Sequence, residues 1–206
     1  MLMIKIFVSI FVLCIYAHLY VHFIVNPNNE CTVLNEMKKE DITNAVYTKQ
    51  PFIFDARDIK KKYELKEKTT ETNYSVYDVS YESIPSLEPY VRFFPCRKVF
   101  ECRKKKRWVE TNKSCRSFYR IEKGMFNITC IHPKYKSIVE SKKDLKKELK
   151  DNKEIIHLTL HQDSIISLPT YWHIYIDPLE KDSILEKIQY YTPLNRVANA
   201  ISKIFN

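Results

Sequence analysis

The pattern of hydrophobic and polar positions separates an apolar N-terminal run from a mixed remainder. Residues 6–25 contain no Asp, Glu, Lys or Arg, and a helix needs an apolar run of about 20 residues to cross a bilayer. The alternative is a cleaved secretory signal, whose apolar region is only about 7–15 residues long and ends at a small-residue cleavage site. The small residue Ala17 is instead followed by more apolar sequence. The run therefore predicts an uncleaved, single-pass anchor.

Beyond the anchor, short β-type runs are separated by turn residues, which predicts a mainly β domain with flanking helices. Alternation with a period of two is clearest near the C-terminal end, where Trp172, Ile174 and Ile176 share one face and His173 lies on the other. The predicted strands are residues 50–56, 74–81, 90–94, 107–110, 117–121, 125–131, 155–160, 164–168 and 172–177.

Three helices are predicted beside these strands. Residues 30–50 suggest a juxtamembrane helix, and residues 136–150 form an amphipathic pattern. A tail helix over residues 193–205 begins with Thr192 as its N-cap and Pro193 at its first position. Its apolar stripe, expected to pack on the outside of the sheet, is Leu194, Val197, Ile201 and Ile204. The chain thus divides into an anchor (1–29), a linker (30–50) and one domain (51–206).

The composition supports a folded domain and excludes several classes of enzyme. The chain is 45% hydrophobic and 13% aromatic, which is typical of a sequence that builds a core. It contains one glycine, Gly124. Glycine-rich phosphate loops and dinucleotide-binding motifs need several glycines for close backbone approach, so kinase, P-loop and Rossmann folds are excluded.

Three Asn-x-Ser/Thr sequons follow the apolar run, at Asn73, Asn112 and Asn127. Such sequons are glycosylation sites when a domain is lumenal or external, although short motifs also arise by chance. The head of residues 1–5 is easier to leave in the cytosol than to translocate. We therefore predict a membrane protein whose C-terminal domain is lumenal or external.

Cysteine usage fits that location. Cys14 lies in the apolar run, and Cys31 stands apart near the membrane as the odd one out. An external domain would pair the other four in disulfides of undetermined connectivity. These four are Cys96, Cys102, Cys115 and Cys130. Their C-x5-C-x12-C-x14-C spacing lacks the tight pairs that are usual in structural zinc sites.

The formal net charge is +9, and much of the excess is local. A basic run precedes Trp108 and consists of Arg103, Lys104, Lys105, Lys106 and Arg107. It suggests either a patch for anionic lipid, nucleic acid or an acidic partner, or a solvated hairpin turn. An external domain rarely meets nucleic acid, so a membrane, a protein or an anionic surface is the expected partner.

Residues 154–176 resemble the closing strands of the cupin-like superfamily that includes Jumonji-C domains, and residues 50–56 resemble its opening strand. The residues matching the family motif are Asp163, Pro169, Tyr171, Trp172 and His173. The chain looks most like degenerate, membrane-anchored members carried by large DNA viruses. The resemblance implies a double-stranded β-helix.

Catalytic members of that superfamily are Fe(II) and 2-oxoglutarate oxygenases that use an early His-x-Asp/Glu and a distal histidine. His173 occupies the distal position. The His-x-Asp of this chain, residues 161–163, falls in a predicted turn, where Asp163 is better interpreted as a turn residue. His173 is therefore expected to be a core histidine, with no metal ligand, cofactor or catalytic residue assigned. The expected function is a non-enzymatic structural or interaction role; the alternative is an oxygenase with an altered triad.

Overall fold

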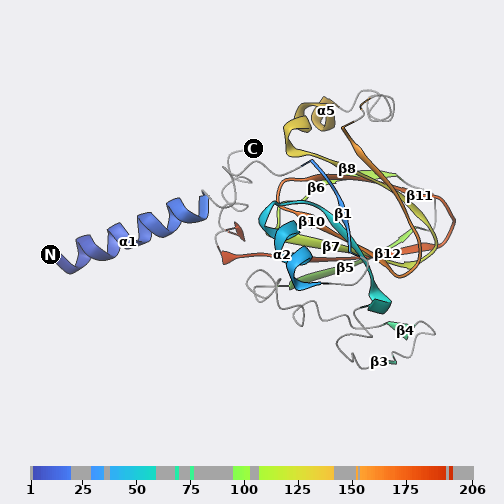
Figure 1. Cartoon of the computed structure of the whole chain (residues 1–206), viewed down its shortest axis with the longest axis horizontal. Helices are drawn as coiled ribbons and strands as arrows, with labels where there is room; N and C mark the ends of the chain where they lie inside the picture. Colours follow the sequence, from blue (N-terminus) through green and yellow to red (C-terminus); the bar gives the residue numbers. More distant parts are fainter. Residues whose placement is uncertain are drawn as a thin grey trace.

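A computed structural model describes residues 2–19, 29–34, 38–58, 68–69, 75–76, 95–102, 107–141, 152, 154–193 and 195–196. The first element is helix α1 (Leu2–Leu19), which extends away from the strand-rich part of the chain (Figure 1). Within the residues described, no helix is long and apolar enough to span a membrane.

The larger of two main sheets has six strands in the order β1-β2-β10-β7-β12-β5. Its strands are β1 (Thr32–Val33), β2 (Phe52–Asp55), β5 (Pro95–Cys102), β7 (Arg116–Lys123), β10 (Ser164–Pro169) and β12 (Ser183–Tyr190). The pairing of β1 with β2 is parallel, whereas the other pairs are antiparallel. The sheet therefore unites the beginning, the middle and the end of the domain.

The smaller main sheet is antiparallel, with the order β6-β11-β8-β9. Its strands are β6 (Trp108–Thr111), β8 (Phe126–Ile131), β9 (Ile156–Leu160) and β11 (His173–Pro178). A separate pair joins β3 (Lys68–Thr69) to β4 (Ser75–Val76). Helices after α1 include α2 (Lys39–Tyr47), the 3-10 turn η4 (Pro133–Tyr135) and α5 (Lys136–Ser141), and residues 56–58, 193 and 195–196 are also helical.

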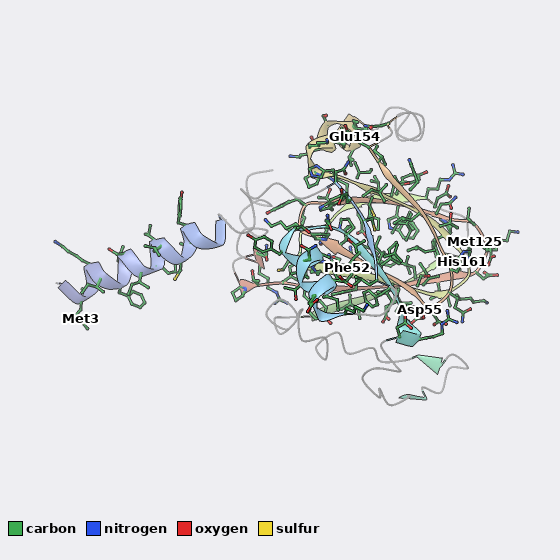
Figure 2. All side chains as sticks on the ribbon, in the orientation of Figure 1. Met3, Phe52, Asp55, Met125, Glu154 and His161 are labelled. Atoms are coloured by element: carbon green, nitrogen blue, oxygen red, sulfur yellow. The ribbon has the colours of Figure 1, made fainter. Side chains whose placement is uncertain are left out.

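The main core lies between the two large sheets, because inward-facing residues of both belong to one hydrophobic cluster. Figure 2 shows side chains filling this space, while those of α1, including Met3, lie apart. Ile42 of α2 joins a second cluster with Phe52 and Phe118 of the six-stranded sheet. Val139 of α5 joins a third with Ile131 of the four-stranded sheet. Each sheet thus carries a helix on its outer face.

Gly124 lies in the turn from β7 to β8, and the geometry of this turn explains why a glycine is found there. Gly124 has φ +83°, and a Cβ atom built there would lie 2.4 Å from Oγ of Ser183. An L-residue is strained at that φ and would also collide with the start of β12. The turn therefore requires glycine both for its backbone and for its packing.

The predicted mainly β architecture with flanking helices is confirmed. Most predicted strands after residue 107 match within one or two residues. Residues 30–50 are not one helix: β1 pairs with β2, and α2 is confined to Lys39–Tyr47. The hydroxyl of Thr192 accepts a hydrogen bond from the backbone N–H of Asn195 at 3.2 Å, which confirms the predicted N-cap. Residues 90–94, 142–150, 194 and 197–205 lie outside the described residues, as does most of 74–81.

Candidate functional site

His173 lies at the start of β11 and faces away from the main core. Its neighbours Trp172 and Ile174 belong to the cluster between the sheets, whereas Tyr175, on the same face as His173, packs against the outer cluster under α5. This alternation is the one predicted from the sequence. His173 is 3% exposed, and its Nδ1 shares a 2.7 Å hydrogen bond with Oγ1 of Thr111. Burial is the main cause that lowers the pKa of His173. Of two α5 residues with smaller effects, Glu140 raises this pKa and Lys136 lowers it.

The His-x-Asp segment is far from His173. Residue 161 follows Leu160, which pairs with Phe126 at one end of β8, while His173 pairs with Ile131 at the other end. The two ends are separated by about 16 Å, given roughly 3.3 Å per strand residue. A single metal ion cannot be reached from both ends of β8, so the residues do not form the iron triad of the oxygenases.

Asp163 instead organises a turn. Its φ is +68°, its N–H donates to the carbonyl of Ile121, and its carbonyl accepts from the N–H of Ala56. Its carboxylate lies 3.8 Å from the Arg120 guanidinium. These contacts agree with its interpretation as a turn residue. Among the described residues, no group of three or more His, Cys, Asp or Glu is placed to hold a metal ion.

The space between the sheets is packed with large side chains. Trp172, Tyr119 and Phe126 are fully buried there, and the inward-facing isoleucines fill the volume around them. Edge-on contact with the His132 ring, at 5.2 Å between centroids, closes the region beside Trp172. A substrate would have to displace these side chains, because protein cores are packed to crystal-like density.

An ion pair and a phenol, which we call the inter-sheet cluster, connect the two sheets across this core. Glu110 comes from β6 of the smaller sheet, and Tyr119 and Lys187 come from adjacent strands of the larger one. The Tyr119 hydroxyl donates to Glu110 Oε1 at 2.9 Å, and Lys187 Nζ donates to Oε2 at 2.5 Å. The Lys187 ammonium also lies 5.3 Å from the centre of the Tyr119 ring.

Burial decides what the inter-sheet cluster can do. Lys187 has a side chain that is 5% exposed, against 24% for Glu110, and Tyr119 is completely buried. Burial, followed by the neighbouring Glu110 charge, raises the pKa of Tyr119 well above its usual value. The phenol therefore stays protonated and acts as a donor. Sequence reasoning missed this cluster because charged residues on a strand are usually assigned to solvent.

A second polar network surrounds Asn112, in the connection from β6 to β7. Its Nδ2 donates to the carbonyls of Leu168 and Pro169, each at 2.8 Å. Its Oδ1 accepts from Ser114 and from the Ser117 hydroxyl at 2.7 Å. Asn112 is fully buried, so the prediction of a glycosylation site there is wrong for the folded protein. Every polar atom of this amide already has a partner.

The other sequons differ from Asn112. Asn127 is exposed on β8, where its Oδ1 accepts from the Thr159 hydroxyl at 2.9 Å. Asn73 lies outside the described residues. Asn127 is thus a sequon asparagine that a modifying enzyme can reach in the folded domain.

The predicted disulfides among the four cysteines stay a prediction. Cys115 and Cys130 are buried free thiols in this structure. Burial raises the pKa of Cys115 to about 11. Cys96 and Cys102 lie on β5, but their side chains are outside what is described.

The predicted basic patch is described in part. Residues 103–106 lie outside the described residues. Arg107 is half-exposed and its Nε donates to Asp177 Oδ1 at 2.8 Å. This hydrogen bond, together with the Asp177 charge, raises the pKa of Arg107. Its charge is therefore partly neutralised at the start of β6.

No protein-family model and no curated protein matches the sequence. Similar solved structures include a Bacillus subtilis oxalate decarboxylase variant, with 5% identity, a TM-score of 0.36, and coverage of 48% of this chain and 22% of that one. The cupin domain of Cnp3 from Schizosaccharomyces pombe has 11% identity and a TM-score of 0.35, covering 51% and 57%. RmlC from Streptococcus suis, in complex with dTDP-D-xylose, has 11% identity and a TM-score of 0.33. The match covers 52% of this chain and 53% of that one. The chain spans less than two thirds of the length of each of these structures.

Proposed function

We propose that this protein is a membrane-anchored, non-enzymatic cupin-like domain with a structural or interaction role, of the type carried by large DNA viruses. The main support is the orientation of β11. The histidine at the family's metal position faces an outer helix, while Trp172 and Ile174 fill the interior. A cupin-like enzyme would need its metal ligands and a cavity inside the barrel.

The anchor is supported by the character of α1. Its side chains are exposed and apolar around the helix, including Phe7, Phe11 and Leu13 at 56–74% exposure. Such a helix is unfavourable in water and favourable in lipid. The apolar run continues in the sequence to residue 25, beyond the described end of α1. We place the rest of the chain on the lumenal or external side.

The proposed partner is a protein or another anionic surface at the membrane. The net charge of +9 and the basic run at residues 103–107 favour acidic groups. Nucleic acid is not proposed, because a lumenal or external domain rarely meets it. Because large side chains occupy the space between the two sheets, we place the partner-binding surface on the outside of the domain.

The experiment that tests the absence of an iron site is calorimetry of the full chain in detergent with Mn(II), with and without 2-oxoglutarate. We expect no saturable binding. Micromolar binding that disappears in His173→Ala would establish the oxygenase alternative instead. His161→Ala serves as the matched control, because it removes an exposed histidine that lies near the opposite end of β8 from His173.

Membrane placement is tested separately by carbonate extraction and by glycan mapping. The full chain is expected in the pellet, and Asn127→Gln is expected to remove a glycan that Asn112→Gln does not. Release into the supernatant, or a mature N-terminus beyond residue 25, would refute the anchor.

A further inference from the structure

Two cysteines that are far apart in the sequence approach the same part of the core. Cys31 immediately precedes β1, is partly buried, and packs against the cluster between the sheets. Cys130 lies on β8 and belongs to that cluster, with no exposed surface. Both are free thiols in this structure.

Backbone contacts near the two cysteines bring their segments together. Nδ2 of Asn29 donates to the carbonyl of Glu154 at 2.6 Å, so the segment before β1 is tied to the residues that lead into β9. In the neighbouring ladder, Cys130 is the register partner of Ile156. Cys31 is two residues from Asn29, and Ile156 is two residues from Glu154. The contact therefore brings Cys31 to the end of β8 that carries Cys130.

The ionisation of the thiols provides independent support. Burial raises the pKa of Cys31 to about 12. The pKa of Cys130 is raised well above its usual value by burial and then by the charge of Cys31. A neighbouring charge affects a thiol only over a short distance. Both thiols therefore lie in a low-dielectric region, and the charge of Cys31 is among the groups that act on Cys130.

We propose that Cys31 and Cys130 form a disulfide that fastens the membrane-proximal segment to β8. In the reaction, the two thiols give up two protons and two electrons to a disulfide oxidant such as oxidised glutathione. The oxidant is reduced to two thiols, and one S–S bond forms in the protein. In the cell, this step rests on the proposed lumenal or external placement, because such compartments are oxidising.

The bridge would have a mechanical consequence. Strand β1 is a two-residue edge strand paired with β2, and it follows directly from the N-terminal segment. A pull on the anchor would strip such a short strand from its sheet. A covalent link to β8, which has neighbours on both sides, would transfer the load to the four-stranded sheet.

The thiolate is the form that attacks a disulfide. Because both thiols are protonated at neutral pH in the folded protein, closure is expected during folding, before the core forms around Cys130. The folded, reduced protein should oxidise slowly, whereas the refolding chain should oxidise rapidly.

The test is to refold the reduced full chain in detergent and a glutathione redox buffer, then block free thiols and map peptides without reduction. A linked pair of peptides containing Cys31 and Cys130 is expected. Cys31→Ser should lower Tm by roughly 5–10 °C under oxidising conditions and should leave it nearly unchanged under reducing conditions. Cys115→Ser is the matched control, because it removes another buried free thiol and should show no difference between the two conditions.

Two results would overturn the proposal. One is that both cysteines are recovered as blocked free thiols from oxidised, folded protein. The other is that either one is linked to a different cysteine. Because the refolding is done in a defined buffer, its outcome does not depend on the compartment. If the bridge forms there but the protein isolated from cells is reduced, the lumenal or external placement is wrong and the pairing stands.

Discussion

Asn112 is the residue on which the connection between β6 and β7 depends most directly. Asn112→Ala removes two donated and several accepted hydrogen bonds from a fully buried position. The carbonyls of Leu168 and Pro169 would then be buried without this donor. We expect the free energy of unfolding to fall by about 2–4 kcal/mol, measured by urea denaturation.

Asn127→Ala is the control for that measurement. It removes an exposed asparagine that holds one hydrogen bond, from Thr159, so a change within about 1 kcal/mol is expected. Equal losses at the two positions would contradict the role given to the buried network.

His173 should make stability depend on pH. Its folded pKa is lowered from the usual 6.5, chiefly by burial. As the pH falls below 6.5, the His173 imidazole binds a proton in the unfolded chain but stays neutral in the folded protein, so the free energy of unfolding decreases. Glu140 favours the charged imidazole and Lys136 opposes it, but both effects are smaller than burial.

The matching experiment compares urea unfolding at pH 7.5 and pH 5.0. His173→Asn is expected to lose less stability between these values than the wild type does. His161→Asn, at an exposed position, should keep the wild-type difference. A wild-type pH dependence in His173→Asn would refute the assignment.

For single residues, the sequence predicts a local role more successfully than it predicts whether the residue is buried. The N-cap of Thr192, the turn at Asp163 and the alternation about His173 follow from neighbouring residues, and the first two are confirmed by hydrogen bonds. The burial of Asn112 does not follow, because it depends on a contact with Leu168, more than fifty residues away. A sequon reports the residue types at one place and contains no information about such contacts.

At the scale of elements, two of the strands missed by sequence reasoning, β5 and β12, lie side by side in the larger sheet. Strand β12 pairs with β5 on one side and β7 on the other. Its charged residues Glu186 and Lys187 are 2% and 4% exposed, where a strand pattern would require apolar residues. The Glu110 carboxylate, which reaches Lys187 from β6 of the opposite sheet, makes the Lys187 charge tolerable, and no local pattern contains that contact.

Helix α2 is a case in which the sequence indicates the helix, although not its limits. Its Ile42 is 1% exposed and packs with Phe52, Phe54 and Phe118, while Tyr47 is 82% exposed. Ile42→Ala should lower the free energy of unfolding by about 2–5 kcal/mol, through lost burial and an unfilled cavity. Tyr47→Ala, one turn further along, should change it by about 0.5 kcal/mol or less. Chemical denaturation of both variants checks this.

A result with equal costs for the two helix variants would mean that α2 is not held on the sheet. It would also question the packing of Leu34, which joins the same cluster as Ile42.

At the scale of the whole molecule, the two main sheets meet over an apolar core that has a charged connection at one place. Hydrophobic contact is indifferent to the exact alignment of the sheets. The inter-sheet cluster is directional, because Glu110 must reach both Tyr119 and Lys187. Such buried polar groups cost desolvation energy and are kept where they select one arrangement in some proteins. We expect the cluster to define how the sheets are aligned.

A double-mutant cycle tests that expectation. Glu110→Gln leaves the nearly buried Lys187 ammonium without its counter-charge, so a loss of about 2–4 kcal/mol in the free energy of unfolding is expected. Lys187→Met should cost less, because Glu110 retains partial exposure and the Tyr119 donor. The double variant should recover most of the stability lost by Glu110→Gln, since it removes both charges together. Additive losses would mean that the two charges do not interact across the sheets. Amide exchange of β6 in the double variant would then distinguish stability from alignment: faster exchange at wild-type stability is the signature expected if the cluster selects the arrangement of the sheets.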